Sequence, residues 1–253
     1  MENNRAFYSV LERVGGRGEY QRFSLVFWSL MFMVSGSVSY FSPFLFYQQG
    51  YACPDAANCK EFVCNLPPAQ REAFIDPSFT SLASKFGDYR CDGGSELQKL
   101  QSFIYFGGVF GMVAGIILNS YITKKKVITL TVVAGMLGLG FTLLASSLYL
   151  AAIGLFITFA AVSVQIELIV CCVTESVDEE VRGRHTVMLY IFFSIGATFN
   201  GLFFKLIPNW EIVLFLTNII PLAICLAGLL FYIEETPFDL IINNSPEHSL
   251  KVL

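Results

Sequence analysis

Charged residues are scarce in this sequence, and so are the groups that enzymes commonly use. Only 14% of its 253 residues are charged, and only two are histidines. It has no phosphate-binding P-loop, no nucleophile elbow and no His-Glu-x-x-His motif. The formal net charge of −4 is spread out, without a basic tract of the kind that binds nucleic acid. We therefore expect neither an enzyme nor a nucleic-acid-binding protein, and no cofactor.

Hydrophobic residues are abundant instead, at 55% of the chain, with a mean hydropathy of +0.60. They form runs of about 20 residues, the length that crosses a hydrocarbon core of roughly 30 Å. The runs are continuous and do not alternate at a period of two, which favours helices over strands. The sequence predicts an all-α membrane protein with six transmembrane helices, at 23–47, 101–121, 127–147, 148–173, 187–206 and 212–233.

Two boundaries in this prediction depend on single features. The stretch 127–173 is apolar throughout and too long for one crossing, and residues 146–149, with the sequence SSLY, form its only plausible turn. The polar residues 48–99 interrupt the helices as one large loop. The predicted organisation is an N-terminal segment (1–22), a six-helix bundle (23–233) with the loop 48–99 between helices 1 and 2, and a polar C-terminal tail (234–253).

Basic residues indicate which side of the membrane each loop occupies. They precede the first run and fill the second-to-third and fourth-to-fifth connections, whereas the short loops on the opposite side have almost none. By the positive-inside rule, both termini face the cytoplasm or its equivalent, such as the mitochondrial matrix. The residues concerned are Arg5, Arg13, Arg17, Arg22, Lys124, Lys125, Lys126, Arg182 and Arg184.

The predicted loop carries four of the seven cysteines, Cys53, Cys59, Cys64 and Cys91. On this topology it lies on the non-cytoplasmic side, where disulfides persist. Four cysteines allow three pairings, and the spacing does not choose among them. Free thiols are the alternative. We expect no metal site, because the loop has no Cys-x-x-Cys pair and both histidines lie outside it.

Three motifs connect the chain to a known family. The opening LERVGGRGEYQRF resembles the membrane-entry segment of the organic cation and carnitine transporters of the major facilitator superfamily. The stretch VTESVDEEVRGRHTVMLYIFFSIG is similar to that family's fourth-to-fifth turn, and IPNWEIVLFLTNIIPLAICLAGLLFYIEETPFDLI to its sixth helix. The order of these motifs resembles the N-terminal six-helix half of such a transporter.

The resemblance implies a gate-like charge cluster on the cytoplasmic side. In the superfamily the turn between helices 2 and 3 reads approximately Gly-x-Leu-Ala-Asp-Arg-x-Gly-Arg-Lys, and this chain has Asn119 where the Asp stands. A neutral amide cannot make the charge-assisted bonds of a carboxylate. The lysines could equally serve as a positive-inside anchor. The implied members are Asn119, Lys124, Lys125, Glu175, Arg182, Arg184 and Glu235.

Polar residues within the spans form a second candidate site. Gln165 and Glu167 lie in the fourth run, and an ionisable group inside a membrane is by default a functional candidate. A carboxylate there could serve as counter-ion to a transported cation, or it could contact another helix or a partner subunit. Asn200 and Asn218 are expected to make hydrogen bonds between helices.

The predicted function follows from what the family requires. Its transporters have two six-helix halves, with substrate between them near the bilayer midplane. This sequence contains one half with a degenerate gating turn. We therefore expect a structural or accessory subunit of a larger membrane assembly; the alternatives are a homodimeric transporter of small organic ions and a fragment of a full-length transporter.

The expected partners are the lipid bilayer and other membrane subunits, or a second copy of the chain. The resemblance points to the plasma membrane, and the mitochondrial inner membrane or another organelle membrane satisfies the same topology.

Overall fold

The structure is a computed structural model that describes residues 19–48, 51, 59–74, 80–89, 91, 94–177 and 179–235. Within these ranges there is no β-strand, and six helical spans are long and apolar enough to cross a membrane. They are α2 (Glu19–Ser39) with α3 (Ser42–Leu45), α7 (Ser95–Asn119), α8 (Lys124–Leu144), α9 (Leu148–Ser176), α10 (Glu179–Leu206), and α11 (Trp210–Leu214) with the π-helical η2 (Phe215–Ile219) and α12 (Ile220–Phe231). The predicted fold class is confirmed. Most of the N-terminal segment and of the C-terminal tail, together with Cys53, lies outside the described residues.

Hydropathy located the spans better than it located the helix ends. Helix α7 begins at Ser95, inside the predicted loop, and α10 begins at Glu179, eight residues before the predicted run. Both first turns are polar, so they extend a helix beyond the apolar stretch that hydropathy detects. The turn predicted at 146–149 is confirmed, because α8 ends at Leu144 and Ser147 caps α9, its Oγ accepting a hydrogen bond from the Leu150 N–H at 3.3 Å.

The first span is broken near its outer end. Helix α2 stops at Ser39, and the short α3 starts at Ser42. Pro43 causes the break: its ring lacks an N–H and clashes with the carbonyl four residues earlier, which is that of Ser39. The interruption lies at the end of the bundle where the cysteine loop enters.

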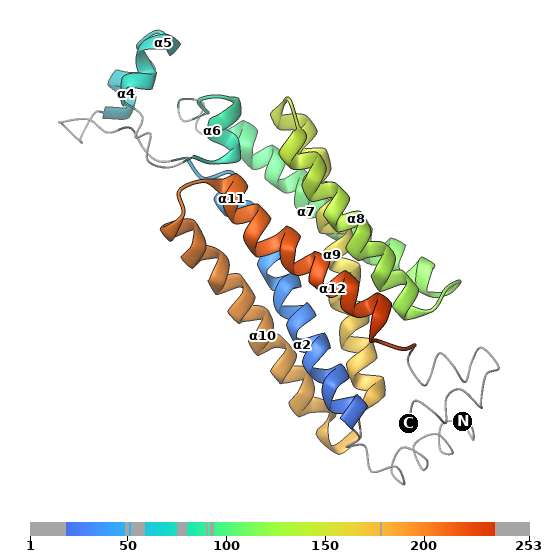
Figure 1. The fold of residues 1–253 in the computed structure, drawn as a ribbon. Helices are drawn as coiled ribbons and strands as arrows, with labels where there is room; N and C mark the ends of the chain where they lie inside the picture. Colours follow the sequence, from blue (N-terminus) through green and yellow to red (C-terminus); the bar gives the residue numbers. More distant parts are fainter. Residues whose placement is uncertain are drawn as a thin grey trace.

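The cysteine loop contains four short helical pieces among its described residues. They are α4 (Cys59–Cys64), α5 (Pro68–Arg71), the 3₁₀ turn η1 (Glu72–Phe74) and α6 (Leu82–Phe86). Figure 1 shows α4 and α5 standing away from the bundle, with α6 against its end. We call this the outer end, and we call the opposite end, where α7, α9 and α12 finish, the inner end.

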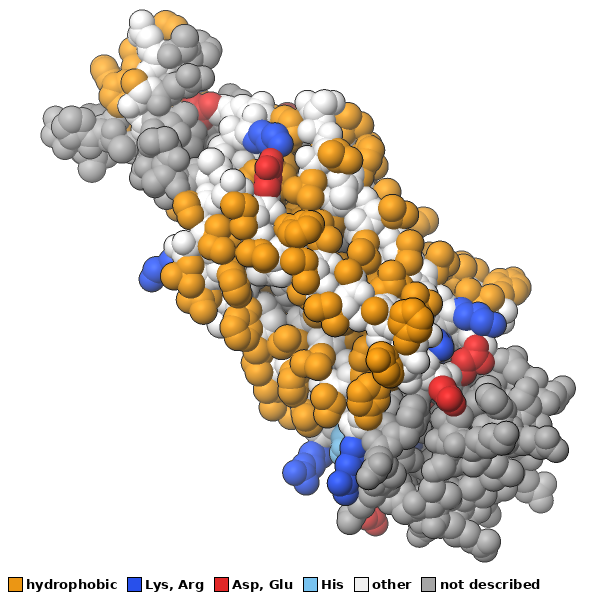
Figure 2. All heavy atoms as spheres, in the orientation of Figure 1, with side chains coloured by type: hydrophobic (Ala, Val, Ile, Leu, Met, Phe, Trp, Pro, Cys, Tyr) orange, Lys and Arg blue, Asp and Glu red, His pale blue; other side chains and the backbone are white. Residues whose placement is uncertain are grey.

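The six spans form two groups joined through α9. Helices α7 and α8 pack on α9, and α10 packs on α2. Contacts of α2 with α9 and of α12 with α8 join the two groups (Figure 1). The α9 and α2–α3 spans are accordingly the most buried, and α10 is the least buried. Figure 2 shows hydrophobic side chains over the flank of the bundle, with charged side chains gathered toward its ends.

Glycines set the spacing between α7 and α9. Gly107, Gly111 and Gly115 recur every four residues and face Phe156, Ala160 and Val164 in turn. A Cβ on Gly107 would lie 2.6 Å from the Phe156 carbonyl oxygen, and one on Gly111 would overlap the backbone of Ala160. Because the contacts advance together along both helices, α7 and α9 run parallel, with their backbones in direct contact.

Close contacts at glycine also join the first and fifth spans. A Cβ on Gly36 would overlap the backbone of Phe193 in α10, and one on Gly196 would overlap that of Met33 in α2. Small residues let helices approach closely in lipid, where burial of apolar surface gives no net drive to associate. Each group of helices is therefore held by contacts that only glycine permits.

We expect the substitution Gly111→Ala to destabilise the bundle by about 1–3 kcal/mol, because the added methyl group collides with backbone that cannot move aside cheaply. Gly140→Ala in α8 is the matched control, since a Cβ there meets open space. Thermal unfolding in detergent, followed by circular dichroism, should show a lower Tm for Gly111→Ala alone. Equal Tm values for the two variants would contradict the close-packing account.

Candidate functional site

The lysines at the start of α8 form ion pairs with two other segments at the inner end. Lys124 Nζ lies 3.1 Å from Glu175 Oε2 in the last turn of α9, and Lys126 Nζ lies 3.8 Å from Glu235 Oε1 after α12. The Thr123 hydroxyl donates to the same Glu235 oxygen at 2.9 Å. Three spans are therefore joined at the inner end by this cluster of charges.

The first of these pairs is the more buried. The Lys124 side chain is 8% exposed and that of Glu175 is 26% exposed, against 68% for Lys126. Positive charge in the first turn of a helix opposes the helix dipole, so α8 gains from carboxylates placed beside it. The partly buried Lys124–Glu175 pair is screened less by salt than the exposed one.

Three other members of the predicted cluster, Asn119, Lys125 and Arg184, do not join these pairs among the described residues. Asn119 is half-buried at the last residue of α7, Lys125 is half-buried, and Arg184 is exposed. Within the described part of the chain, none of the three side chains makes a hydrogen bond or an ion pair. Arg182 is half-buried in the first turns of α10. The structure thus assembles Lys124, Glu175 and Glu235 at this end, and Asn119, at the gating position, makes no hydrogen bond or ion pair with them among the described residues.

Gln165 and Glu167, the predicted intramembrane pair, leave α9 on nearly opposite sides, because two residues are separated by about 200° around a helix. Gln165 is fully buried against α2, where the Ser35 hydroxyl donates to its Oε1 at 3.5 Å. Its Nε2 has no hydrogen-bond partner among the described residues. Glu167 is half-buried and has no described hydrogen bond or ion pair.

The glycine register places Glu167 along the membrane axis. Gly108 lies against Ser163, one turn before Glu167 on the same side of α9, so Glu167 faces toward α7. Gly115 is level with Val164, which puts Glu167 level with the last turn of α7. The carboxylate is eight residues from Glu175, or about 12 Å deeper into the bundle from the inner end.

A second buried polar cluster connects α2, α10 and the π-helical turn η2. The Thr217 hydroxyl donates to Asn200 Oδ1 at 2.8 Å, and the Ser37 hydroxyl lies 3.2 Å from Asn218 Oδ1. Asn200 Nδ2 donates to the Ser37 carbonyl, and Asn218 Nδ2 to the Thr217 hydroxyl at 2.9 Å. These are the interhelical bonds that the sequence predicts for the two asparagines.

Sequence reasoning missed the partners in this cluster. Ser37 and Thr217 stand in apolar runs and carry no signal beyond the rule that hydroxyl side chains bond across helices in lipid. The π-turn itself was also unforeseen; such turns are rare and often occur at functional sites. Since each asparagine finds partners inside the bundle, this cluster has the character of a structural joint.

At the outer end, disulfide bonds constrain the cysteine loop. Cys64 and Cys91 form a disulfide with their Cα atoms 5.4 Å apart, and Cys59 is also disulfide-bonded. The expectation of disulfides in this loop is thereby confirmed, and the Cys64–Cys91 pairing is one that the spacing did not choose. Nearby, partial burial and then the Glu96 carboxylate raise the pKa of Tyr89 above its ordinary value. The described residues contain no group of three His, Cys, Asp or Glu side chains placed to hold a metal ion.

The loop is also joined to the sixth span, which the sequence did not predict. Lys85 Nζ lies 2.8 Å from Glu211 Oε1 and 5.5 Å from the centre of the Trp210 ring. The Thr80 N–H donates to the Pro208 carbonyl at 2.9 Å. The Lys85 side chain is 41% exposed and that of Glu211 is 45% exposed, so the ion pair contributes little to stability. Its role is to position α6 on α11.

Six apolar spans, glycine-packed and with charged turns at the inner end, define a multi-pass integral membrane protein. The sequence model of the family described as "Sugar (and other) transporter" matches residues 78–253, and the chain belongs to that family. Membership confirms the broader part of the predicted resemblance, a transporter family of the major facilitator type; the organic cation and carnitine subtype stays a prediction. No curated protein matches the chain.

We expect Lys124→Met and Glu175→Gln each to lower the free energy of unfolding, because each removes one side of a poorly solvated ion pair. A double-mutant cycle should give a coupling of about 1–2 kcal/mol, in the range of contacting pairs. Its control is the cycle of Lys125→Met with Glu175→Gln, which should be additive. A coupling as large for Lys125 would show that net charge, and not the contact, stabilises this end.

Proposed function

We propose that this chain is the six-helix unit of a solute transporter of the major facilitator type, and that Glu167 is the counter-ion for a small organic cation. The observation that carries the proposal is a half-buried carboxylate inside a membrane-spanning helix with no described partner. Family membership supplies the transport class. The substrate class comes from the charge of Glu167.

The energetic argument rests on the cost of such a group. A charged side chain at the centre of a spanning helix costs about 2.5–3.5 kcal/mol, and one nearer the helix end costs less, so those that persist face a cavity, a partner or a transported ion. The asparagines of the η2 cluster show that this bundle can satisfy deep polar groups internally. Glu167 is an exception, and a cation would supply the missing opposite charge.

Gln165, on the other side of α9, supports a transporter whose two helix groups move when a ligand binds. Its buried Nε2 donor lacks a partner among the described residues, which costs about 1–3 kcal/mol relative to a bonded amide. The amide lies where α9 meets α2, the contact that joins the two helix groups. An unsatisfied donor at this contact makes it less stable, which favours a bundle whose two groups can shift relative to each other.

A structural or accessory role is the second candidate, and the inner end favours it. Asn119 brings no charge to the gating position, and Lys124 is already paired with Glu175. An inner end held by fixed pairs suits a subunit kept for its shape. The two candidates differ in a measurable way: an accessory subunit extracted in mild detergent co-purifies with other proteins in a fixed ratio, and its native mass exceeds that of one or two copies.

The identity of the membrane is also part of the proposal. Disulfides in the outer loop require an oxidising compartment, which the cell exterior and the mitochondrial intermembrane space both provide. We propose the plasma membrane from the resemblance to organic cation transporters, with the mitochondrial inner membrane as the alternative.

Glu167→Gln should lower cation binding and uptake at least ten-fold, because the amide keeps the shape of the carboxylate and removes its charge. The assay uses tetraethylammonium as the probe: its effect on the Tm of the purified chain reports binding, and labelled uptake into proteoliposomes reports transport.

Glu180→Gln is the matched control, because Glu180 is an exposed carboxylate at the start of α10. Binding that is unchanged by Glu167→Gln would exclude the counter-ion role. Binding without uptake would retain the site and would show that translocation needs a further component.

A further inference from the structure

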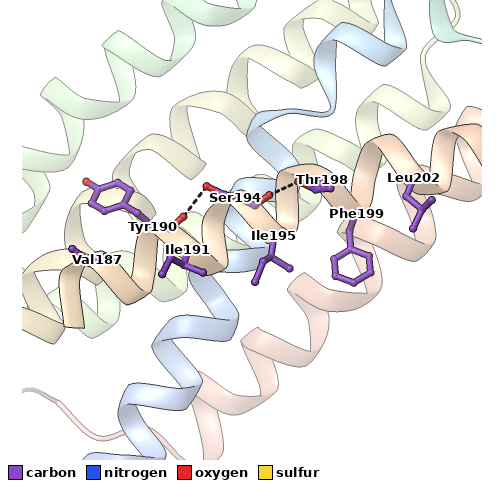
Figure 3. Close-up of a pocket in the computed structure, with 8 residues that line it drawn as sticks. All are labelled: Val187, Tyr190, Ile191, Ser194, Ile195, Thr198, Phe199 and Leu202. Atoms are coloured by element: carbon purple, nitrogen blue, oxygen red, sulfur yellow. Dashed lines mark hydrogen bonds between the residues drawn. The ribbon is translucent and has the colours of Figure 1, made fainter. Parts of the chain in front are cut away.

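A groove of about 590 Å³ runs along an exposed side of α10, the helix that supplies all of its described lining residues. It extends from Val187 to Leu202, and Figure 3 shows Ile191, Ile195 and Phe199 projecting into it from successive turns. The hydrophobic side chains that line the groove are between 38% and 61% exposed. The groove is therefore an open, mainly apolar strip on the surface of a membrane-spanning helix.

Three residues that line this groove carry a hydroxyl group, Tyr190, Ser194 and Thr198, and two of the three hydroxyls donate to the backbone of α10. Ser194 Oγ donates to the Tyr190 carbonyl at 2.9 Å, and Thr198 Oγ1 donates to the Ser194 carbonyl at 2.8 Å (Figure 3). The Ser194 and Thr198 hydroxyls therefore each donate their only hydrogen to the backbone of their own helix. A sugar or an amine would find few free polar partners along this surface, whereas a hydrocarbon chain loses nothing by lying there.

A basic residue stands at the inner end of the groove. Arg184 is exposed, and within the described residues its side chain has no ion pair or hydrogen bond. It precedes Val187 by three residues and Ile191 by seven, so it lies on the same face of α10 as the groove. The positive-inside topology places this end in the leaflet that carries anionic phospholipids.

The length of the groove fits one lipid chain. From Val187 to Leu202 the helix rises about 22 Å, more than the roughly 15 Å that one leaflet contributes to the hydrocarbon core. An acyl chain that starts at the level of Arg184 can therefore remain in the groove over the full depth of its leaflet.

We propose that α10 holds an anionic phospholipid, with its phosphate on Arg184 and one acyl chain in the groove between Val187 and Leu202. The charge at the inner end selects the headgroup, and the apolar lining selects the chain. This site is separate from Glu167, and the proposal does not depend on which solute the protein carries. A second copy of the chain packing on the same face is the competing occupant.

The test uses the purified full chain with dioleoyl-phosphatidylglycerol or dioleoyl-phosphatidylcholine, and native mass spectrometry counts the lipids that stay bound. We expect the anionic lipid to be retained in preference to the zwitterionic one. Arg184→Gln should weaken its retention about five-fold, the effect of one basic residue near a membrane surface. Ile195→Trp should fill the groove and abolish retention of the bound lipid.

Two matched controls separate the site from general effects. Lys205→Gln removes an exposed charge from the opposite end of α10, and Ile116→Trp adds the same bulk to an exposed position of α7. Neither should change lipid retention. Equal retention of the two lipids, or an Arg184→Gln variant that binds as the unmodified chain does, would overturn the proposal. If the chain forms a dimer that Ile195→Trp dissociates, and the bound lipid does not change, this face of α10 would be the interface with a second copy and the lipid proposal would fail.

Discussion

Close approach of helix backbones through glycine is the constraint on which the rest of this structure depends. In lipid, apolar side chains gain little by meeting one another, so dispersion contacts and hydrogen bonds at short range must hold the helices together. The α7–α9 contact uses Gly107, Gly111 and Gly115, and the α2–α10 contact uses Gly36 and Gly196. These contacts fix the parallel register of α7 and α9, and with it the depth of Glu167.

Polar groups inside the bundle obey a second constraint, because each needs a partner where water is excluded. Asn200 and Asn218 meet this need through Ser37 and Thr217, and the π-turn η2 brings Thr217 and Asn218 to them. Gln165 and Glu167 meet it incompletely. The contrast separates a joint that holds three spans together from a region whose polar groups are available for function.

Charges at the two ends act on the same sixth span. At the outer end Lys85 pairs with Glu211, and at the inner end Lys126 and Thr123 contact Glu235. The span between them connects with α2 and α8, so movement of either helix group changes the position of its ends. The exposed pairs contribute little stability individually, and their arrangement sets where the span begins and ends.

The sequence by itself determined the class of protein, the six spans, the outer cysteine loop and the family, because apolar length, charge placement and motif order are local properties of the chain. It also named Lys124, Glu175, Glu235, Gln165 and Glu167. Only the tertiary structure decided that Lys124 meets Glu175, that Asn119 makes no such ion pair or hydrogen bond with any described residue, and that Gln165 and Glu167 point to different sides of α9. Those outcomes depend on helix register and rotation, which packing across residues distant in sequence sets and no local pattern records.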